Sequence, residues 1–130
     1  MRVNPQEFQA FPKQLVIGFV PASSGPKQIQ QSLEGAGLAD DQVDFLSGEE
    51  GLEILTRGGG SAGLLQRLIR RIERISQEGL HLGAAIDHLR AGNAMVAIRR
   101  VRAEDAPGIR SALESAGVGN HHYFGRLTFD

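Results

Sequence analysis

The stretch LESAG at Leu113–Gly117 nearly repeats LEGAG at Leu33–Gly37, and the residues around the two copies match as well. Each copy closes a predicted helix, because apolar residues at helical spacing run into a glycine that ends the helix. The apolar residues are Ile29, Leu33 and Ala36 in the first copy and Ile109, Leu113 and Ala116 in the second. Both copies share the apolar stripe and the glycine that ends the helix. This favours a repeated structural unit over a chance match of five residues.

Predicted strands flank both helices. Residues 14–21 (QLVIGFVP) and 93–101 (NAMVAIRRV) are rich in strand-forming residues and precede the helices. Residues 42–48 (QVDFLSG) and 121–129 (HHYFGRLTF) follow them. A strand–helix–strand unit used twice predicts an α+β fold of ferredoxin-like type, in which a four-stranded antiparallel sheet carries two helices on one face.

Turn residues indicate where the two helices begin. Ser24 precedes Pro26 and Asp105 precedes Pro107, and proline is favoured in the first turn of a helix. Serine and aspartate side chains accept hydrogen bonds from the free N–H groups of a first turn. We therefore expect Ser24 and Asp105 to be the N-caps.

The length of 130 residues suits a single domain. Between the two halves, a short helix near Glu49 and a glycine-rich break precede an amphipathic helix over 64–78. We expect this insertion to cover the open face of the sheet or to pack on a partner chain. The predicted segments are an N-terminal arm at 1–13, a first half at 14–48, the helical insertion at 49–92 and a second half at 93–130.

Composition excludes several classes of protein. The absence of cysteine rules out disulfides and thiolate metal sites, and no histidine spacing resembles a zinc motif. The net charge of −1 and the aromatic content of 5% argue against nucleic-acid binding. No apolar run has the length of a membrane span or signal peptide, so we expect a cytoplasmic protein with no membrane contact and no cofactor.

Three further stretches carry a family resemblance. FLSGEEGLEIL at 45–55, LRAGNAMVAIRRV at 89–101 and HHYFGRLTF at 121–129 resemble the YflT-like bacterial general stress proteins and related uncharacterised proteins. The resemblance covers most of residues 14–129. It implies an intracellular bacterial protein of ferredoxin-like type without an established activity, and it supplies no catalytic residues.

The strongest candidate binding feature is an arginine stripe on the predicted helix over 64–78. Its members share one helix face and are Arg67, Arg70, Arg71 and Arg74. Like charges at this spacing repel one another, so the stripe is either a solvated face or a contact surface for an acidic protein or an anionic small molecule.

The C-terminal strand supplies the other candidates. His121 and His122 are adjacent and therefore point to opposite faces of a strand, as do Tyr123 and Phe124. His121 and Tyr123 are candidate ligand or partner contacts. Arg126, with Arg99 and Arg100 on the other strand of the second half, is expected to form a basic edge or sheet face.

Together with the family resemblance, which implies the role in stress, these features predict a non-enzymatic, stress-associated protein that works through self-association and protein contact. We expect a homodimer formed through the uncovered face of the sheet, because exposed apolar area is unfavourable. One alternative is a sensor that binds a small anion where two chains meet. Another is a small dimeric α+β enzyme that uses His121, His122 or Tyr123 in a pocket.

Overall fold

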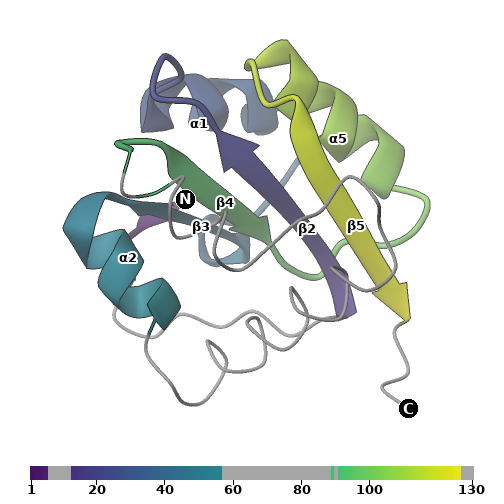
Figure 1. Cartoon of the computed structure of the whole chain (residues 1–130). Helices are drawn as coiled ribbons and strands as arrows, with labels where there is room; N and C mark the ends of the chain where they lie inside the picture. Colours follow the sequence, from purple (N-terminus) through teal and green to yellow (C-terminus); the bar gives the residue numbers. More distant parts are fainter. Residues whose placement is uncertain (6–12, 57–88, 90, 127–130) are drawn as a thin grey trace.

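The computed structural model describes residues 1–5, 13–56, 89 and 91–126 (Figure 1). Helices and strands alternate along this part of the chain, which confirms the α+β class. In order, the elements are β1 (Arg2–Val3), β2 (Lys13–Val20), α1 (Pro26–Glu34), β3 (Val43–Ser47), α2 (Gly48–Thr56), β4 (Ala94–Ile98), α5 (Ala106–Ser115) and β5 (Asn120–Arg126).

Within the described residues, five strands form one mixed sheet in the order β1-β3-β4-β2-β5. The neighbours from β3 to β5 are antiparallel, whereas β1 runs parallel to β3. The predicted four-stranded antiparallel sheet is therefore corrected at one edge, where part of the predicted arm forms a strand. This edge forms because Arg2 pairs with the buried Asp44, and the Asn4 side chain bonds both the N–H and the C=O of Ser47.

The two halves of the chain meet at the centre of the sheet. β2 and β4, the first strands of the halves, are direct neighbours, with Gly18 opposite Val96. The pairing predicted for the strands near Val16 and Val96 is confirmed. Since β4 also separates β2 from β3, and β2 separates β4 from β5, each half fills a gap between the strands of the other.

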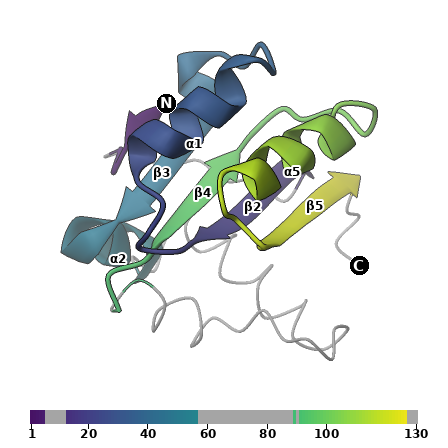
Figure 2. The same ribbon diagram turned by 90° about the horizontal axis from the view of Figure 1, so that it is seen from above.

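One face of the sheet is covered by α1 and α5, which lie side by side (Figure 2). The leucines and isoleucines of the predicted apolar stripes are buried in this layer, as is Ala116. Burying one such leucine or isoleucine side chain contributes roughly 1.5–3 kcal/mol. The main members of this core are Val16, Val20, Ile29, Leu33, Phe45, Val96, Ile98, Ile109 and Leu113. Ala36, predicted to belong to the first stripe, is instead exposed and lies beyond Glu34, where α1 ends.

The opposite face of the sheet is also buried. Its large side chains, each at most 7% exposed, are Leu15, Ile17, Phe19, Leu46, Met95 and Phe124. On this side α2 packs against β3 (Figure 2). Among the described residues, Val3 alone is a large exposed hydrophobic side chain. The expectation of an uncovered apolar face is therefore wrong for this part of the chain.

One of the two predicted N-caps, Ser24, is wrong. Ser24 is buried and donates its hydroxyl to the carbonyl of Ala116, 2.8 Å away, so it ties the start of α1 to the end of α5. Gly25 takes the N-cap position instead. Asp105 occupies the N-cap position of α5, but its side chain makes no capping hydrogen bond. Gly37 and Gly117 follow the two helices with φ of 69° and 91°. Such positive φ values favour glycine at both positions.

Candidate functional site

The structure locates two of the predicted site residues. His121 and Tyr123 lie on β5, with both side chains on the side of α5. The arginine stripe lies outside the described residues, and its members are Arg67, Arg70, Arg71 and Arg74. The geometry of a candidate site can therefore be built from β5 and its neighbours.

His121 is held between two side chains of α5. The Nε–H of Arg110 donates to Nδ1 of His121 at 2.8 Å, and Nε2 of His121 lies 2.8 Å from Oε1 of Glu114. Both ring nitrogens of His121 are therefore engaged by side chains of α5, one by Arg110 and the other by Glu114. The His121 side chain is only 7% exposed, and the chain of contacts fixes β5 to α5.

Arg110 differs from the other arginines whose side chains the structure describes. Those are Arg2, Arg99, Arg100 and Arg102, and each lies within 4.0 Å of a carboxylate. Arg110 has no such partner in the described part of the chain and contacts the imidazole of His121 instead. Its guanidinium is oriented by His121 through Nε, which leaves its terminal nitrogens available to an anion.

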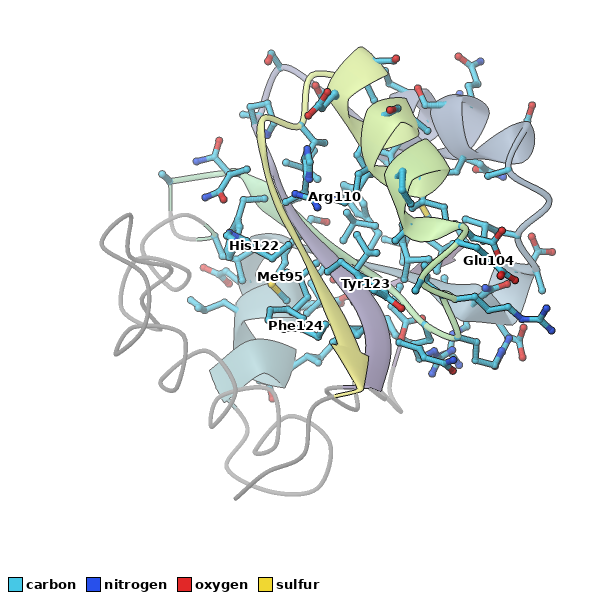
Figure 3. All side chains as sticks on the ribbon, turned by 90° about the vertical axis from the view of Figure 1, so that its right-hand side faces the viewer. Met95, Glu104, Arg110, His122, Tyr123 and Phe124 are labelled. Carbon is cyan, nitrogen blue, oxygen red and sulfur yellow. The ribbon has the colours of Figure 1, made fainter. Side chains whose placement is uncertain are left out.

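Tyr123 and His122 lie on opposite sides of β5 (Figure 3). The Tyr123 hydroxyl donates to the carbonyl of Val101 at 2.7 Å, while Nε2 of His122 lies 2.9 Å from Oδ1 of Asn120. Burial lowers the pKa of His122 below its ordinary value of 6.5, and the positive charges near it act in the same direction. His122 therefore lies on the other face of the strand from His121 and Tyr123.

The hydrogen-bond pattern of the sheet determines which backbone groups of β5 point outward. The N–H of Arg99 donates to the carbonyl of Gln42, so odd-numbered residues of β4 bond to the β3 side. Direction alternates along a strand, and the even-numbered residues therefore bond to β2. Their partners in β2 are Val16, Gly18 and Val20.

The remaining residues of β2 bond to β5. Leu15, Ile17 and Phe19 lie opposite Phe124, His122 and Asn120, so these three residues of β5 face inward. By alternation, the N–H and C=O groups of His121, Tyr123 and Gly125 face away from the sheet. No described residue pairs with these outward groups. Among the described residues, β5 is thus an edge strand whose outward hydrogen-bonding side has no partner.

The opposite edge of the sheet carries a buried ion cluster that sequence reasoning missed. Asp44 is 0% exposed and accepts from Nε and Nη2 of Arg2 at 2.8 and 3.1 Å. Nη1 of Arg99 lies 3.8 Å from the same carboxylate. Burial lowers the pKa of Arg99, and the charge of Asp44 opposes this shift. Asp44 alternates with the apolar Val43 and Phe45, a pattern that predicts a polar face of the strand, and no local signal marks Asp44 as buried.

The predicted basic edge is replaced by ion pairs where the structure describes it. Arg99 faces Asp44, and Nη2 of Arg100 lies 3.0 Å from Oδ1 of Asp41 at the surface. The side chain of Arg126 lies outside the described residues. Arg99 and Arg100 are therefore not free to form a cationic surface.

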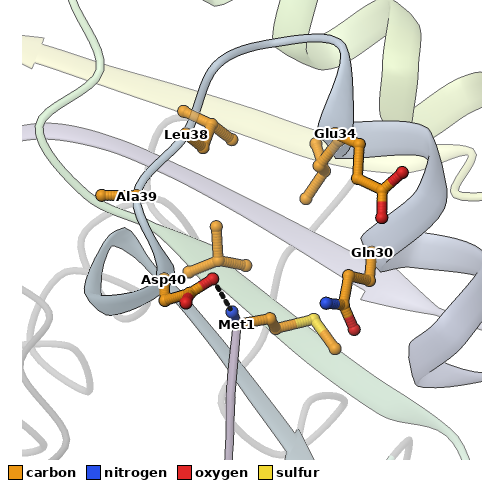
Figure 4. A pocket seen from close by; sticks show the side chains of 8 residues that line it. Met1, Gln30, Glu34, Leu38, Ala39 and Asp40 are labelled. Carbon is orange, nitrogen blue, oxygen red and sulfur yellow. Dashed lines mark hydrogen bonds and ion pairs between the residues drawn. The ribbon is translucent and has the colours of Figure 1, made fainter.

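The described part of the chain includes two concavities beside α1. One, of about 60 Å³, lies between α1 and the start of β3, where the N-terminal amine is 3.3 Å from Asp40 (Figure 4). At roughly 30 Å³ per water molecule it has room for about two waters. The other, of about 330 Å³, lies between α1 and α5 and has Glu104 and Asp105 on its wall. These carboxylates disfavour an anionic ligand in that groove.

Within the described ranges, no group of three or more histidine, aspartate or glutamate residues is arranged to hold a metal ion. No helix in that part of the chain is long and apolar enough to cross a bilayer. Comparison with protein-family models, with curated proteins and with solved structures found no match for this chain.

Proposed function

We propose that this chain is a non-enzymatic, stress-associated protein of the cytoplasm that works by binding other protein chains along the outer edge of β5. The observation that carries the proposal is the outward direction of the backbone groups of His121, Tyr123 and Gly125, which have no partner among the described residues. An extended segment of a partner satisfies such groups by adding a strand to the sheet. The role in stress and the location rest on the resemblance to the YflT-like proteins.

The ferredoxin-like assignment belongs to the same proposal. The antiparallel order β3-β4-β2-β5 and the placement of α1 and α5 over one face support it. In this assignment β1 is an addition that closes the β3 edge. The β5 edge remains the place where another chain can extend the sheet.

The composition of β5 also favours strand addition. Proteins protect open edges with very short strands, proline, lysine or bulges, because unpaired edges bind other strands. β5 spans seven residues and contains neither proline nor lysine. Its own pairing with β2 continues in one register from Arg126 to Asn120. A partner strand would therefore meet an edge of constant register.

A photo-crosslinking experiment in cells tests the proposal. A benzoylphenylalanine is placed at Asn120, the exposed first residue of β5, and in a control protein at Lys27, which is exposed on α1. Both are combined with Gly125→Pro, which removes an outward N–H without breaking the β2–β5 ladder. Gly125→Ala is the matched control, because its Cβ would lie 3.5 Å from the Tyr123 ring, an ordinary contact.

We expect protein adducts from position 120 in the Gly125→Ala background and their loss in the Gly125→Pro background. Position 27 should give no adduct that depends on Gly125. Adducts at position 120 that survive Gly125→Pro, or the absence of any adduct there, would show that the edge is not a contact surface. The melting temperature of each variant shows whether the fold is retained.

Arg110 favours a second candidate function, the binding of a small anion. Its guanidinium is positioned by His121 and lacks a carboxylate partner among the described residues. A phosphate or carboxylate could pair with its two terminal nitrogens. Thermal melting with and without inorganic phosphate tests this candidate: the stabilisation should be lost in Arg110→Gln but kept in Arg102→Gln, whose arginine already faces Glu104. Equal stabilisation of both variants would remove the candidate.

A further inference from the structure

We infer that the strand that adds to β5 is β5 of a second copy of this chain, running antiparallel and centred on Tyr123. This inference rests on the proposed function and names its partner. The two sheets would then form one continuous sheet across a two-fold axis. Such an interface is isologous, because the same surface is used by both copies.

The register follows from the outward backbone groups. They occur at every second residue, on His121, Tyr123 and Gly125. In an antiparallel pair, two residues exchange both hydrogen bonds only when the backbone groups of both face the partner strand. With Tyr123 opposite Tyr123 of the partner subunit, His121 faces Gly125 of the partner subunit, and all three residues of each copy are paired. A shift by one pair along the strand leaves one of the three without a partner.

The side chains are compatible with this register. His121 meets a glycine, so the two imidazoles are not directly opposite each other. His122 would lie across from Phe124 of the partner subunit, and Asn120 across from Arg126 of the partner subunit. No two like charges face each other in the pair, and a tyrosine pair forms at the centre, which is a favourable arrangement for neighbouring strands.

The mode of association differs from the one expected from sequence. An apolar sheet face cannot drive self-association here, because Leu15, Ile17 and Phe124 are buried within the single chain. Pairing at the edge instead uses backbone groups and leaves both faces of the sheet as they are. Gly125 assists this approach, since it places no side chain opposite His121.

Sedimentation velocity of the purified chain over a wide range of concentrations tests for the dimer. Wild type and Gly125→Ala should change from monomer to dimer as concentration rises, and Gly125→Pro should remain monomeric with a melting temperature like that of Gly125→Ala when dilute. A wild-type chain that stays monomeric throughout, or a Gly125→Pro chain that still dimerises, overturns the inference.

Disulfide cross-linking tests the register. The chain has no cysteine, so single-cysteine variants report on one position each. Residues in a hydrogen-bonded antiparallel pair have Cα atoms about 5.5 Å apart, which is within the range of disulfides. Tyr123→Cys should therefore oxidise to a covalent dimer several-fold faster than His122→Cys or Phe124→Cys. Faster cross-linking at 122 or 124 contradicts the Tyr123-centred register.

The two experiments separate this inference from the proposed function. If the purified chain is monomeric but position 120 still forms Gly125-dependent adducts with another protein in cells, the second copy is the wrong partner and β5 remains a contact edge. If both experiments fail, both proposals fall.

Discussion

The two edges of the sheet are closed to very different degrees. At one edge, β1 contributes two residues, and side chains complete the pairing through Arg2 on Asp44 and Asn4 on Ser47. At the other edge, β5 is seven residues long, and the backbone groups of Tyr123 and its alternate neighbours have no partner in the part of the chain that the structure describes. A charge buried beneath β1 secures one side of the molecule, whereas the other side is where we propose that a strand adds.

This difference shows how side chains can substitute for backbone pairing. The amide of Asn4 imitates a strand by bonding both backbone groups of Ser47. Asn4 adopts φ of 47°, a conformation that asparagine tolerates better than most residues and that does not continue a strand. β1 therefore ends before it can offer a long template to another chain.

The largest effect is expected from Asp44→Ala, which breaks the closed edge. Arg2 and Arg99 would keep their positive charges in a buried region without the carboxylate between them. Removing one member of a buried pair costs about 3–5 kcal/mol, and urea unfolding measures this loss. Asp41→Asn is the matched control, because Asp41 pairs with Arg100 in full contact with solvent. Equal losses in the two variants would refute the central role of Asp44.

A pair of glycine substitutions sharpens the comparison. A Cβ at Gly51, on α2, would lie 2.8 Å from the backbone carbon of Leu46 and 3.0 Å from Oδ1 of Asn4, so the closed edge must shift. We expect Gly51→Ala to cost about 1–3 kcal/mol. Gly125→Ala at the open edge meets only the Tyr123 ring at 3.5 Å and should change stability by less than about 0.5 kcal/mol. Thermal unfolding of both variants compares the packing at the two edges. A larger loss of stability in Gly125→Ala than in Gly51→Ala would contradict the expectation that the closed edge is packed more tightly.

The smallest effect is the contribution of His122, on the open edge, to the pH dependence of folding stability. Because the pKa of His122 is lower in the folded chain than its ordinary 6.5, the unfolded chain takes up this proton first as pH falls. The contribution of His122 to stability is therefore complete above pH 6.5 and is lost as pH falls from there through the folded pKa. His122→Gln should flatten the stability curve in this window while Asp41→Asn leaves it unchanged. A curve that keeps its slope in His122→Gln would assign the dependence to another group.

Patterns that depend on neighbours in the chain were predictable. The spacing of Ile109 and Leu113 identified the buried face of α5, and the repeated unit placed the strands of Val16 and Val96 in one sheet. The open position of β5 follows from the same topology. The partners of Ser24 and Asp44 could not be predicted, because Ala116 and Arg2 approach them only in the folded chain.

In the candidate site, too, local patterns were predictable and contacts between distant residues were not. His121 and Tyr123 were identified on the last strand, and their shared face follows from strand alternation. Arg110 was not identified, although Arg110 and Glu114 lie four residues apart on α5 and so share a helix face. What the sequence lacked was the position of His121 beneath that face, which depends on how α5 packs on β5.

The interleaving of the halves also constrains biosynthesis. The position between β2 and β3 is filled by β4, which follows β3 after a long stretch of chain. On the ribosome, the first half therefore emerges with a missing central strand and with unsatisfied edges on both sides of the gap. The sheet can close only after Ile98 has left the exit tunnel, so this period of synthesis is when the nascent chain most needs protection from aggregation.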